Sequence, residues 1–285
     1  MGEPRLEETR AVRRPVTAVR VLGVDGDVAR ERPDRLATEE PMEIRVQAPG
    51  TAPEPIAVTM RTPGSDFELA VGFCVSEGIL LDRDTLTEVA YCLGEDGEQE
   101  YNVVTLRVRR PVDLGPPRAF AVNASCGLCG KQTLDDLEVS CAPVADGPSV
   151  SRSVLASLPD QLRGVQRIFD ETGGLHAAAC FSPDGAMVVA REDIGRHNAL
   201  DKVIGNAFLE GRLPLSDCVL MVSGRMSFEI VQKAAVAGIP VLCAVSAPSS
   251  LAVAAAERFG QTLVGFLRED RLNIYTHPER VVLDA

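Results

Sequence analysis

The first half of the chain alternates apolar and polar residues in the way that is typical of β-strands. Residues 42–46 alternate strictly along Met-Glu-Ile-Arg-Val, and residues 56–60 form a short apolar run. Residues 88–93 and 101–108 predict the two strands of a hairpin, because the turn-rich segment 94–98 lies between them. We therefore expect this part of the chain to be mostly β structure.

Helix signals are rare in the first half and become frequent later. Ser65 and Glu68 have the spacing of a capping box, which predicts a helix that continues through about Ser76. A second helix is predicted where apolar residues recur at helical spacing, at Leu158, Leu162, Val165 and Phe169. Gly173 follows them and is suited to the left-handed conformation in which helices often end.

From residue 175 onward the predicted elements alternate between strand and helix. A hairpin over residues 175–181 and 186–191 turns at Pro183-Asp184-Gly185, and a helix follows over residues 197–210. The remaining elements read as strand, helix, strand, helix and strand over residues 218–222, 226–237, 241–245, 250–259 and 263–267. This alternation predicts parallel strands joined by right-handed crossovers.

Shifts in composition predict four segments. Residues 1–15 mix charges without periodicity, which predicts a flexible tail. Residues 16–125 form the β-rich N-terminal domain. Residues 126–149 contain a CxxC motif and a linker rich in proline, glycine and small residues. Residues 150–285 form the second domain, so that the chain is predicted to be an α/β protein with a β-rich N-terminal part.

Bulk composition excludes several classes of function. With 285 residues, of which 45% are hydrophobic, the chain can bury a sizeable core. A formal net charge of -12 argues against binding to a nucleic-acid backbone. No apolar run approaches the roughly 20 residues of a membrane span, and no signal-peptide core is present, so we expect no membrane association and a cytoplasmic location.

The eight cysteines fall into different settings. Cys126 and Cys129 lie three residues apart in the polar, glycine-rich stretch 123–131, where we expect the chemistry. The thiolate is the reactive form of cysteine, and a following helix N-terminus or the nearby Lys131 can lower the pKa of such a thiol. Five others lie in apolar stretches and are predicted to be core residues: Cys74, Cys92, Cys180, Cys218 and Cys243. The eighth, Cys141, lies in a predicted loop.

Three other interpretations of the CxxC motif remain open. It can be half of a zinc site, although the chain lacks a second CxxC at the spacing of structural zinc. A thioredoxin-type dithiol opens a helix after the first strand of a βαβ unit, whereas the residues upstream of Cys126 predict strand and hairpin. Two buried structural cysteines are the third interpretation, which fits the polar setting least.

Loops at the predicted carboxyl edge of the second sheet have the composition of anion sites. Ligands of such sheets bind where strands end and loops enter helix N-termini. Three loops there offer small residues, hydroxyls and N–H groups, over residues 192–198, 222–226 and 246–250. Arg196 and Arg225 add the planar fork that phosphate oxygens favour. We therefore expect a phosphorylated ligand, although each loop alone is also compatible with an ordinary helix cap.

Other side chains near these loops are candidates for the same site. Ser223 contributes a hydroxyl, and His197 lies at a helix start, where it can contact a ligand or act as a cap residue. His176 follows two glycines, which would leave it near a cleft. His277 lies beside a proline and is predicted to be a surface residue.

Four stretches of the chain combine into the pattern of a known family. They are Cys-Gly-Leu-Cys-Gly at 126–130, Thr-Gly-Gly-Leu-His-Ala-Ala at 172–178, Glu-Asp-Ile-Gly-Arg-His-Asn-Ala-Leu-Asp-Lys at 192–202 and Ser-Gly-Arg-Met-Ser-Phe-Glu at 223–229. Together they resemble the formate dehydrogenase accessory sulfurtransferase family, FdhD. The resemblance extends from about residue 36 to about residue 280.

This resemblance implies an activity. A cysteine desulfurase would hand sulfur to the first cysteine of the CxxC motif as a persulfide. The protein would pass that sulfur to the molybdenum bis(molybdopterin guanine dinucleotide) cofactor before its insertion into formate dehydrogenase. Cys126 would then carry the persulfide and Cys129 would assist. The cofactor would be a bound substrate, and no dedicated metal ion is expected.

The resemblance also implies a cofactor-binding stretch near the C-terminus. Its two arginines suit a pyrophosphate, and it consists of Phe266, Leu267, Arg268, Glu269, Asp270 and Arg271. The implied partners are a cysteine desulfurase, formate dehydrogenase and the guanine nucleotide moiety of the cofactor. The sequence is also compatible with a homodimer.

The predicted order of elements in the second half resembles the cytidine deaminase fold, which implies a three-layer α/β/α domain. Deaminases of that fold bind zinc through an H-x-E motif and a P-C-x-x-C motif. Here Ala199 stands where the glutamate would follow His197, and residues 223–226 stand in place of the cysteine pair. We therefore expect the fold without its zinc chemistry.

Two rival functions follow from the open interpretations. In the first, the chain is a non-catalytic carrier that shelters the molybdenum cofactor, and its CxxC motif is structural or zinc-bound. In the second, the chain is a dithiol oxidoreductase. The polar, glycine-rich setting of the two cysteines favours sulfur transfer over the carrier, because a packing role is hard to find there.

Overall fold

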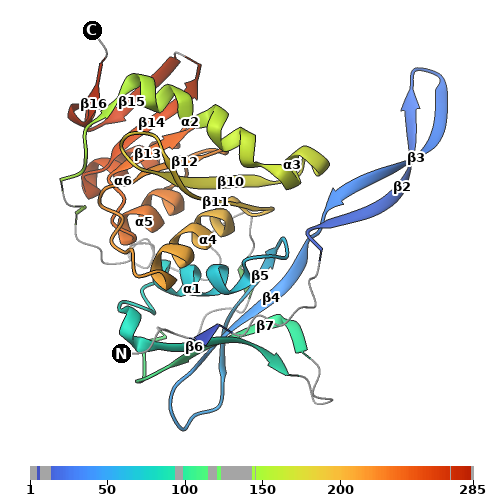
Figure 1. The fold of residues 1–285 in the computed structure, drawn as a ribbon, viewed down its shortest axis with the longest axis vertical. Coiled ribbons are helices and arrows are strands. Elements are labelled where there is room, and N and C mark those ends of the chain that lie inside the picture. Colours follow the sequence, from blue (N-terminus) through green and yellow to red (C-terminus); the bar gives the residue numbers. More distant parts are fainter. Residues whose placement is uncertain are drawn as a thin grey trace.

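The computed structural model of the chain describes residues 5–6, 14–93, 99–114, 121–122, 143–144, 146–269 and 271–283. The CxxC motif with Cys126 and Cys129 lies outside these residues, and so do Cys141 and Asp270. The described residues form a mixed α/β structure with two main sheets, one in each half of the chain (Figure 1).

The N-terminal half is built on a six-stranded sheet in the order β1-β6-β7-β4-β5-β8. The β6–β7 hairpin confirms the hairpin that the sequence predicts, and β4 pairs in parallel with β7. The two residues of β1 pair with β6, so part of the predicted tail contributes an edge strand. The elements of this half are β1 (Arg5–Leu6), β4 (Glu40–Gln47), β5 (Glu54–Arg61), α1 (Asp66–Ser76), η1 (Arg83–Thr85), β6 (Leu86–Leu93), β7 (Gln99–Val108) and β8 (Ala121–Val122).

A separate two-stranded hairpin projects from the body as an arm (Figure 1). Its strands are β2 (Val16–Asp25) and β3 (Val28–Ala37), which pair antiparallel along their whole length. The base of the arm contacts helix α3, where Arg35 Nη1 lies 2.7 Å from Glu171 Oε2. These contacts hold the arm's base against the second half of the chain.

The second half contains a six-stranded sheet in the order β11-β10-β12-β13-β14-β15. Strands β12, β13 and β14 are parallel, and β10 and β11 form an antiparallel hairpin, which confirms both predictions. The strands are β10 (His176–Phe181), β11 (Met187–Asp193), β12 (Val219–Val222), β13 (Val241–Ala244), β14 (Thr262–Arg268) and β15 (Arg271–Thr276). A short two-stranded sheet joins β9 (Val150–Ser151) to β16 (Val281–Val282), which follows η3 (Pro278–Arg280).

Helices cover both faces of this second sheet (Figure 1). Leu155, Leu158 and Leu162 of α2 are buried in one hydrophobic cluster against one face. Buried residues of the other helices lie in a second cluster on the opposite face. The three layers agree with the predicted α/β class, and the closer likeness to cytidine deaminases stays a prediction. The helices are α2 (Arg152–Val165), α3 (Arg167–Thr172), α4 (Arg196–Leu209), α5 (Phe228–Val236) and α6 (Ser250–Phe259).

Two helix predictions are wrong in detail. The helix predicted around residues 158–169 is two helices that meet at Gln166, although Gly173 ends the second in the left-handed conformation as predicted. The capping box at Ser65 does not form, because Ser65 has a positive φ of 55° and makes no side-chain cap hydrogen bond. The carboxylate of Glu68 instead pairs with Arg191, so an ion pair with a distant residue takes the place of the local hydrogen bond of a capping box.

The predicted core cysteines also need a correction. Cys74, Cys180 and Cys243 are buried, as the apolar context predicts, but Cys92 and Cys218 are only half-buried. Cys92 lies on β6 with its sulfur 3.0 Å from the hydroxyl of Thr105. Both residues belong to apolar runs, and a run of this kind does not reveal which residue of a strand faces the solvent.

Helix α1 of the N-terminal half packs directly on α4 of the second half. A Cβ built on Gly72 would lie 1.8 Å from the carbonyl oxygen of Asp201, and a Cβ on Gly205 would lie 1.8 Å from that of Glu68. The two backbones therefore touch, which only glycine allows. One buried cluster runs from β4 through α1 to α4, α5 and α6, so the two predicted domains share a core.

Candidate functional site

The carboxyl ends of four strands meet at one edge of the second sheet. Strands β11 and β12 both run antiparallel to β10, and β13 and β14 continue parallel to β12. Helices α4, α5 and α6 each begin beyond this edge, after β11, β12 and β13 respectively. The structure thus confirms that the three predicted loops lie on one edge.

Backbone hydrogen bonds tie these loops to one another. The amide of Met226 donates to the carbonyl of Ala247, and the amide of Ser249 donates back to Met226. The amide of Phe266 donates to the carbonyl of Ser246, which attaches the end of β14 to the same group. The loops after β12 and β13 and the last turn of β14 therefore form one connected surface.

The helices that begin at this edge differ in whether a side chain caps their first backbone N–H groups. The hydroxyl of Ser249 accepts a hydrogen bond from the amide of Ala252 at 3.2 Å, so α6 has an ordinary cap. Gly195 and Ser227, which precede α4 and α5, make no side-chain cap hydrogen bond. The first amides of α4 are therefore the better anion donors, because an uncapped N-terminus favours negative charge, whereas at α5 the carboxylate of Glu229 accepts a hydrogen bond from its own amide.

His197 joins the starts of α4 and α5. Its Nε2 lies 3.3 Å from the hydroxyl of Ser227 and 3.8 Å from the carboxylate of Glu229. The residue is only 4% exposed. Burial would raise the pKa of Glu229, but hydrogen bonds from His197, Ser227 and its own backbone lower that pKa to about 2. His197 therefore supports the edge from inside and presents little surface to a ligand.

The depressed pKa of Glu229 predicts how stability changes with pH. Its folded-state value of about 2 lies below the ordinary 4.5, so the stabilisation is complete above pH 4.5 and is lost as pH falls through about 2. We expect Glu229→Gln to lower the free energy of unfolding by about 1 to 2 kcal/mol at neutral pH, since water screens part of the full shift. Urea unfolding of both proteins across this pH range measures the effect.

The matched control for this prediction is Glu257→Gln, because the side chain of Glu257 is 67% exposed. Its stability should stay close to that of the wild type at every pH. A Glu229→Gln deficit that persists unchanged down to pH 2 would contradict the role assigned to the ionised carboxylate.

His176 and Ser223 line a cavity of about 560 Å³ at the same edge. Burial lowers the pKa of His176, and the neighbouring Arg196 and His197 lower it further, so the ring is neutral near pH 7. A Cβ on Gly224 would lie 3.3 Å from Nδ1 of His176, so the loop backbone lies close to the imidazole. The prediction that His176 lies near a cleft is confirmed.

Ser223 uses its hydroxyl for structure. The amide of Ala177 donates to Ser223 Oγ at 2.9 Å, and the amide of Ser223 donates to the carbonyl of Ala177 at 3.0 Å. The side chain thus extends the β10–β12 pairing by one step beyond the last strand residue. It holds the loop after β12 beside the start of β10.

Other residues that line the cavity were not selected as site residues from the sequence. They come from α2 and α3 and the loop after α3, and include Arg163, Gln166 and Phe169. The guanidinium carbon of Arg163 lies 4.8 Å from the centre of the Phe169 ring. The only sequence signal for these residues was the helical spacing that includes Phe169. The sequence did not reveal the break between α2 and α3 at Gln166, because that break depends on how the two helices pack on the sheet.

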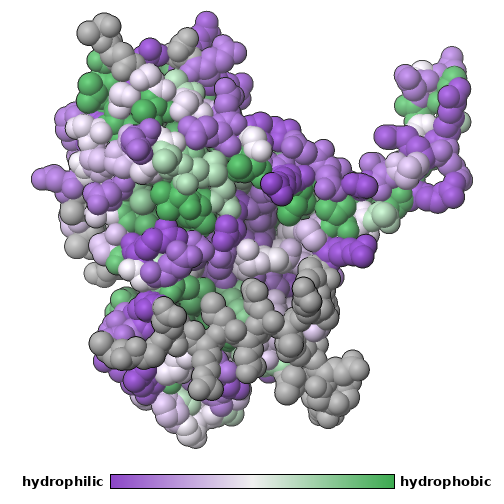
Figure 2. Space-filling model, in the orientation of Figure 1, coloured by the Kyte–Doolittle hydropathy of each residue, from purple (hydrophilic) through white to green (hydrophobic). Residues whose placement is uncertain are grey.

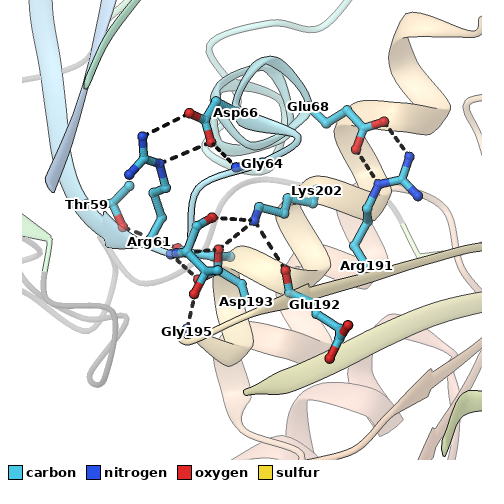
Figure 3. A network of polar contacts seen from close by, with 12 residues as sticks. Thr59, Arg61, Gly64, Asp66, Glu68, Arg191, Glu192, Asp193, Gly195 and Lys202 are labelled. Atoms are coloured by element: carbon cyan, nitrogen blue, oxygen red, sulfur yellow. Dashed lines mark hydrogen bonds and ion pairs between the residues drawn. The ribbon is translucent and has the colours of Figure 1, made fainter. Parts of the chain in front are cut away.

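Much of the 192–202 motif forms a buried polar network (Figure 3). Asp193 is fully buried, and its carboxylate lies 2.7 Å from Nζ of Lys202 and accepts a hydrogen bond from the amide of Gly195. Lys202 also donates to the carbonyl of Thr62, and the amide of Thr62 donates to Asp193. Asn198 donates to Asp193 as well. These residues join the N-terminal half to the start of α4.

The described residues of the predicted cofactor stretch lie at the end of β14 and the start of β15. Leu267 is fully buried in the core, whereas Phe266 is 45% exposed. Phe266 and Glu269 both have positive φ values, of 53° and 49°, which turns the chain sharply. Arg268 pairs with Arg271 across the strands. Both of these arginines are exposed.

Three of the predicted arginines differ in how exposed they are. Arg225 and Arg268 are exposed, and among the described residues neither has a recorded hydrogen bond or ion pair. Arg196 is half-buried beside His176 at the start of α4. Within the described ranges, none of the three lines the 560 Å³ cavity. All three lie at the same edge, at the start of α4, after β12 and at the end of β14.

The predicted nucleophiles Cys126 and Cys129 lie outside the described residues, as does Asp270. Among the residues that are described, no group of three or more His, Cys, Asp or Glu side chains could hold a metal ion. The same residues contain no helix that is long and apolar enough to cross a membrane.

Residues 37–282 match the FdhD/NarQ family. A protein of Streptomyces coelicolor named sulfur carrier protein FdhD is 52% identical over 282 residues, which cover 96% of each chain. Its namesake in Mycobacterium tuberculosis is 51% identical over 92% of this chain and 97% of that protein. The protein of the same name in Thermoplasma volcanium is 44% identical over 89% of this chain and 91% of that protein.

A solved structure is similar throughout the chain. It is the crystal structure of a protein from Desulfotalea psychrophila described as a candidate formate dehydrogenase accessory protein. The TM-score is 0.76 at 25% sequence identity, and the match covers 94% of this chain and all of that one. The fold of the described residues therefore agrees with a structure determined by experiment.

Proposed function

The chain belongs to the FdhD/NarQ family, and from this premise we propose that it is a sulfurtransferase that supports formate dehydrogenase. The observation that carries the proposal is the 52% identity to a sulfur carrier protein over 96% of both chains. The intact Cys-Gly-Leu-Cys-Gly motif supplies the thiols that sulfur transfer requires. The transfer takes place in the cytoplasm, where cysteines stay reduced.

Cys126 is the sulfur carrier in this proposal. Its thiolate attacks the outer sulfur of a persulfide on a cysteine desulfurase, and the cysteine of the desulfurase leaves as a thiolate. The sulfur held on Cys126 leaves as sulfide when a second thiolate attacks the inner sulfur of the persulfide and forms a disulfide with Cys126, which an external thiol later reduces. The sulfide passes to the molybdenum bis(molybdopterin guanine dinucleotide) substrate, which goes on to formate dehydrogenase. Cys129 assists the release of that sulfur.

The guanine nucleotide part of the substrate binds at the carboxyl edge of the second sheet. Arg225, Arg268 and Arg271 are exposed there and can reach phosphate oxygens. The N-terminus of α4, which has no side-chain cap, adds backbone donors and a positive dipole end. His197 and Ser223 act by positioning these loops. The cytidine-deaminase-like arrangement of the domain belongs to the same proposal, with a nucleotide pocket and without zinc.

Mass spectrometry of the loaded protein tests the transfer. After incubation with a cysteine desulfurase and cysteine, the peptide that contains Cys126 is expected to gain about 32 Da, and a reductant should remove this mass. A Cys126 peptide without added mass would favour a cofactor carrier instead. Loss of folding on addition of a chelator would indicate that the CxxC motif binds zinc.

Measurements of nucleotide affinity test the proposed binding site at the carboxyl edge of the second sheet. GDP, used as a fragment of the cofactor, is expected to bind the wild-type protein and to bind more weakly as salt is added. Arg225→Ala and Arg268→Ala should each cost about 1.5 to 3 kcal/mol of binding free energy, the range for hydrogen bonds to charged groups. Isothermal titration calorimetry measures both effects.

The control for the arginine variants is Arg109→Ala, which removes an exposed arginine from the N-terminal half. Its affinity for GDP should equal that of the wild type. The persulfide on Cys126 should form in all three variants, because loading precedes contact with the cofactor. Equal affinities in all four proteins would place the nucleotide elsewhere and leave the sulfur transfer proposal standing.

A further inference from the structure

Two free cysteines, Cys180 and Cys218, lie close together on one face of the second sheet. Cys180 is fully buried in the hydrophobic cluster that contains residues of α4 and α5. Cys218 packs against the same cluster and is half-buried. The sulfur transfer proposed above uses neither of them. The pair is therefore a second thiol site, which is independent of the CxxC motif.

The register of β10 and β12 explains why the two side chains meet. The amide of Ser223 donates to the carbonyl of Ala177, so residues 177 and 223 stand at a hydrogen-bonded position, which recurs at every second residue. Cys180 and Leu220 pair between such positions, where opposite side chains approach most closely. Cys218 precedes Leu220 by two residues, so it is the diagonal neighbour of Cys180 on the same face.

The two thiols hydrogen-bond to each other. This bond and burial hold the pKa of Cys180 well above its usual range, so Cys180 keeps its proton and donates it to the bond. The same bond lowers the pKa of Cys218, and burial opposes this effect. The positive charge of Arg212 lowers the pKa of Cys218 further, against the negative charge of Asp217. Cys218 is therefore the thiol that ionises first.

Arg212 is fixed at the end of α4. Its guanidinium donates to the side chain of Asn206, and its Nε lies 3.2 Å from the carboxylate of Glu210. A fixed cation near a half-buried thiol favours the thiolate, which is the form that attacks an oxidant. Cys243 on the next strand shows the contrast, because it is fully buried and burial raises its pKa to about 12.

The surroundings of the pair favour a small, uncharged oxidant. The loop that leads from α4 to β12 also lines a cavity of about 550 Å³ whose other walls are mostly apolar. Hydrophobic residues are exposed among hydrophilic ones on the body of the protein (Figure 2). Apolar surroundings disfavour a charged molecule but not hydrogen peroxide. Peroxide can also reach a half-buried sulfur, whereas Cys180 has no exposed surface.

We propose that Cys218 and Cys180 form an oxidant-sensitive dithiol, which hydrogen peroxide converts into a disulfide between β12 and β10. The Cys218 thiolate first attacks one oxygen of the peroxide. The S–O bond forms, the O–O bond breaks, and hydroxide leaves and takes up a proton. The sulfur of Cys180 then attacks the sulfenic acid, the S–S bond forms, and the oxygen leaves as water with the proton of Cys180. The two thiols lose two electrons, and one peroxide becomes two waters.

The disulfide would lie away from the proposed cofactor edge. His176 begins β10 and Ser223 follows β12 at that edge, whereas Cys180 and Cys218 lie near the other ends of these two strands. The oxidation therefore needs neither the cofactor nor the CxxC motif. A small thiol should reverse it by thiol–disulfide exchange.

Peptide mass spectrometry of the full chain tests the proposal. Trypsin releases Cys180 in the peptide 168–191 and Cys218 in the peptide 213–225, and neither contains another cysteine. After treatment with peroxide and blocking of the remaining thiols with iodoacetamide, we expect these peptides as one linked species. Dithiothreitol should separate them. Cys126 and Cys129 lie in a different peptide, so their oxidation is measured separately.

Three alanine variants separate the two steps. Cys218→Ala is expected to remove the linked species and to leave Cys180 reduced, because peroxide does not reach the buried thiol. Cys180→Ala keeps the first step, so dimedone should trap a sulfenic acid on Cys218. Cys92→Ala is the matched control, since it removes another half-buried thiol and should form the linked species like the wild type. Circular dichroism checks that each variant is folded.

Arg212→Gln tests the role of the nearby cation. The variant is expected to react with iodoacetamide at Cys218 at least about threefold more slowly at pH 7, because loss of the positive charge raises the pKa of the thiol. The midpoint of the pH profile of this reaction should move to higher pH. A purely structural role of Arg212 would leave that midpoint unchanged.

A linked species that forms in the wild type and in Cys92→Ala, and is absent from Cys218→Ala and Cys180→Ala, supports the proposal. Wild-type peptides that stay unlinked after peroxide overturn it, whether or not Cys218 carries a sulfenic acid. A disulfide from Cys218 to any cysteine other than Cys180 also overturns it. An unchanged pH midpoint in Arg212→Gln contradicts the role assigned to Arg212.

Discussion

Gly205→Ala is expected to prevent the protein from folding stably. The added Cβ would lie 1.8 Å from the carbonyl oxygen of Glu68 and 2.8 Å from the amide nitrogen of Gly72, both of which are backbone atoms of α1. No side-chain rotation can relieve that contact, so the two helices must move apart and disturb the core shared by both halves. We expect a loss of more than about 4 kcal/mol, against a total stability of about 5 to 15 kcal/mol.

The control for this prediction is Gly164→Ala in α2. A Cβ at that position meets no heavy atom within 4 Å. Alanine also has the higher helix propensity, so this variant should be as stable as the wild type or more stable by about 0.5 to 1 kcal/mol. Urea unfolding followed by circular dichroism compares the three proteins. An equal unfolding midpoint for Gly205→Ala would mean that α1 and α4 lie farther apart than described.

Cys126→Ala is expected to reduce the maturation of formate dehydrogenase to background. The thiolate is the group that forms the persulfide, and alanine has no atom that can replace it. Because the sequence predicts a polar loop around this residue, the stability of the variant should change by less than about 0.5 kcal/mol. The measurement is formate dehydrogenase activity in cells that depend on each variant, together with the unfolding midpoint of the purified protein.

Two variants control for the loss of a thiol. Cys129→Ala should retain part of the activity, since its proposed role is to assist release. Cys92→Ala removes a half-buried thiol on β6 and should leave persulfide formation intact. An active Cys126→Ala protein beside an inactive Cys129→Ala protein would reverse the roles of the two cysteines.

Local pattern was a good guide wherever burial alone decides the structure. The parallel strands β12 and β13 are fully buried and read as continuous apolar runs in the sequence. Their alternation with helices predicted the parallel arrangement, and the position of three loops on one edge followed from it. Gly173 was identified as a helix end for a similar reason, since its positive φ is a local property of the backbone.

Local pattern was misleading where a distant partner competes for the same side chain. Glu68 has the spacing of a capping box, but its carboxylate binds Arg191, which lies far along the chain. His197 is a ligand candidate because it opens a helix, and its ring also lies 3.3 Å from the hydroxyl of Ser227 and 3.8 Å from the carboxylate of Glu229. Neither competitor is visible from sequence spacing.

The sequence by itself determined the class of fold, the family and the cysteine pair on which the proposed chemistry rests, because these depend on residue types and on order along the chain. Only the tertiary structure decided that Asp193 and Lys202 are buried partners joining the two halves of the protein, and that Gly72 and Gly205 set the distance between α1 and α4. It also decided that Arg163, Phe169 and His176 line one cavity. Such contacts join residues far apart in the chain, and their energies depend on distances that only packing sets.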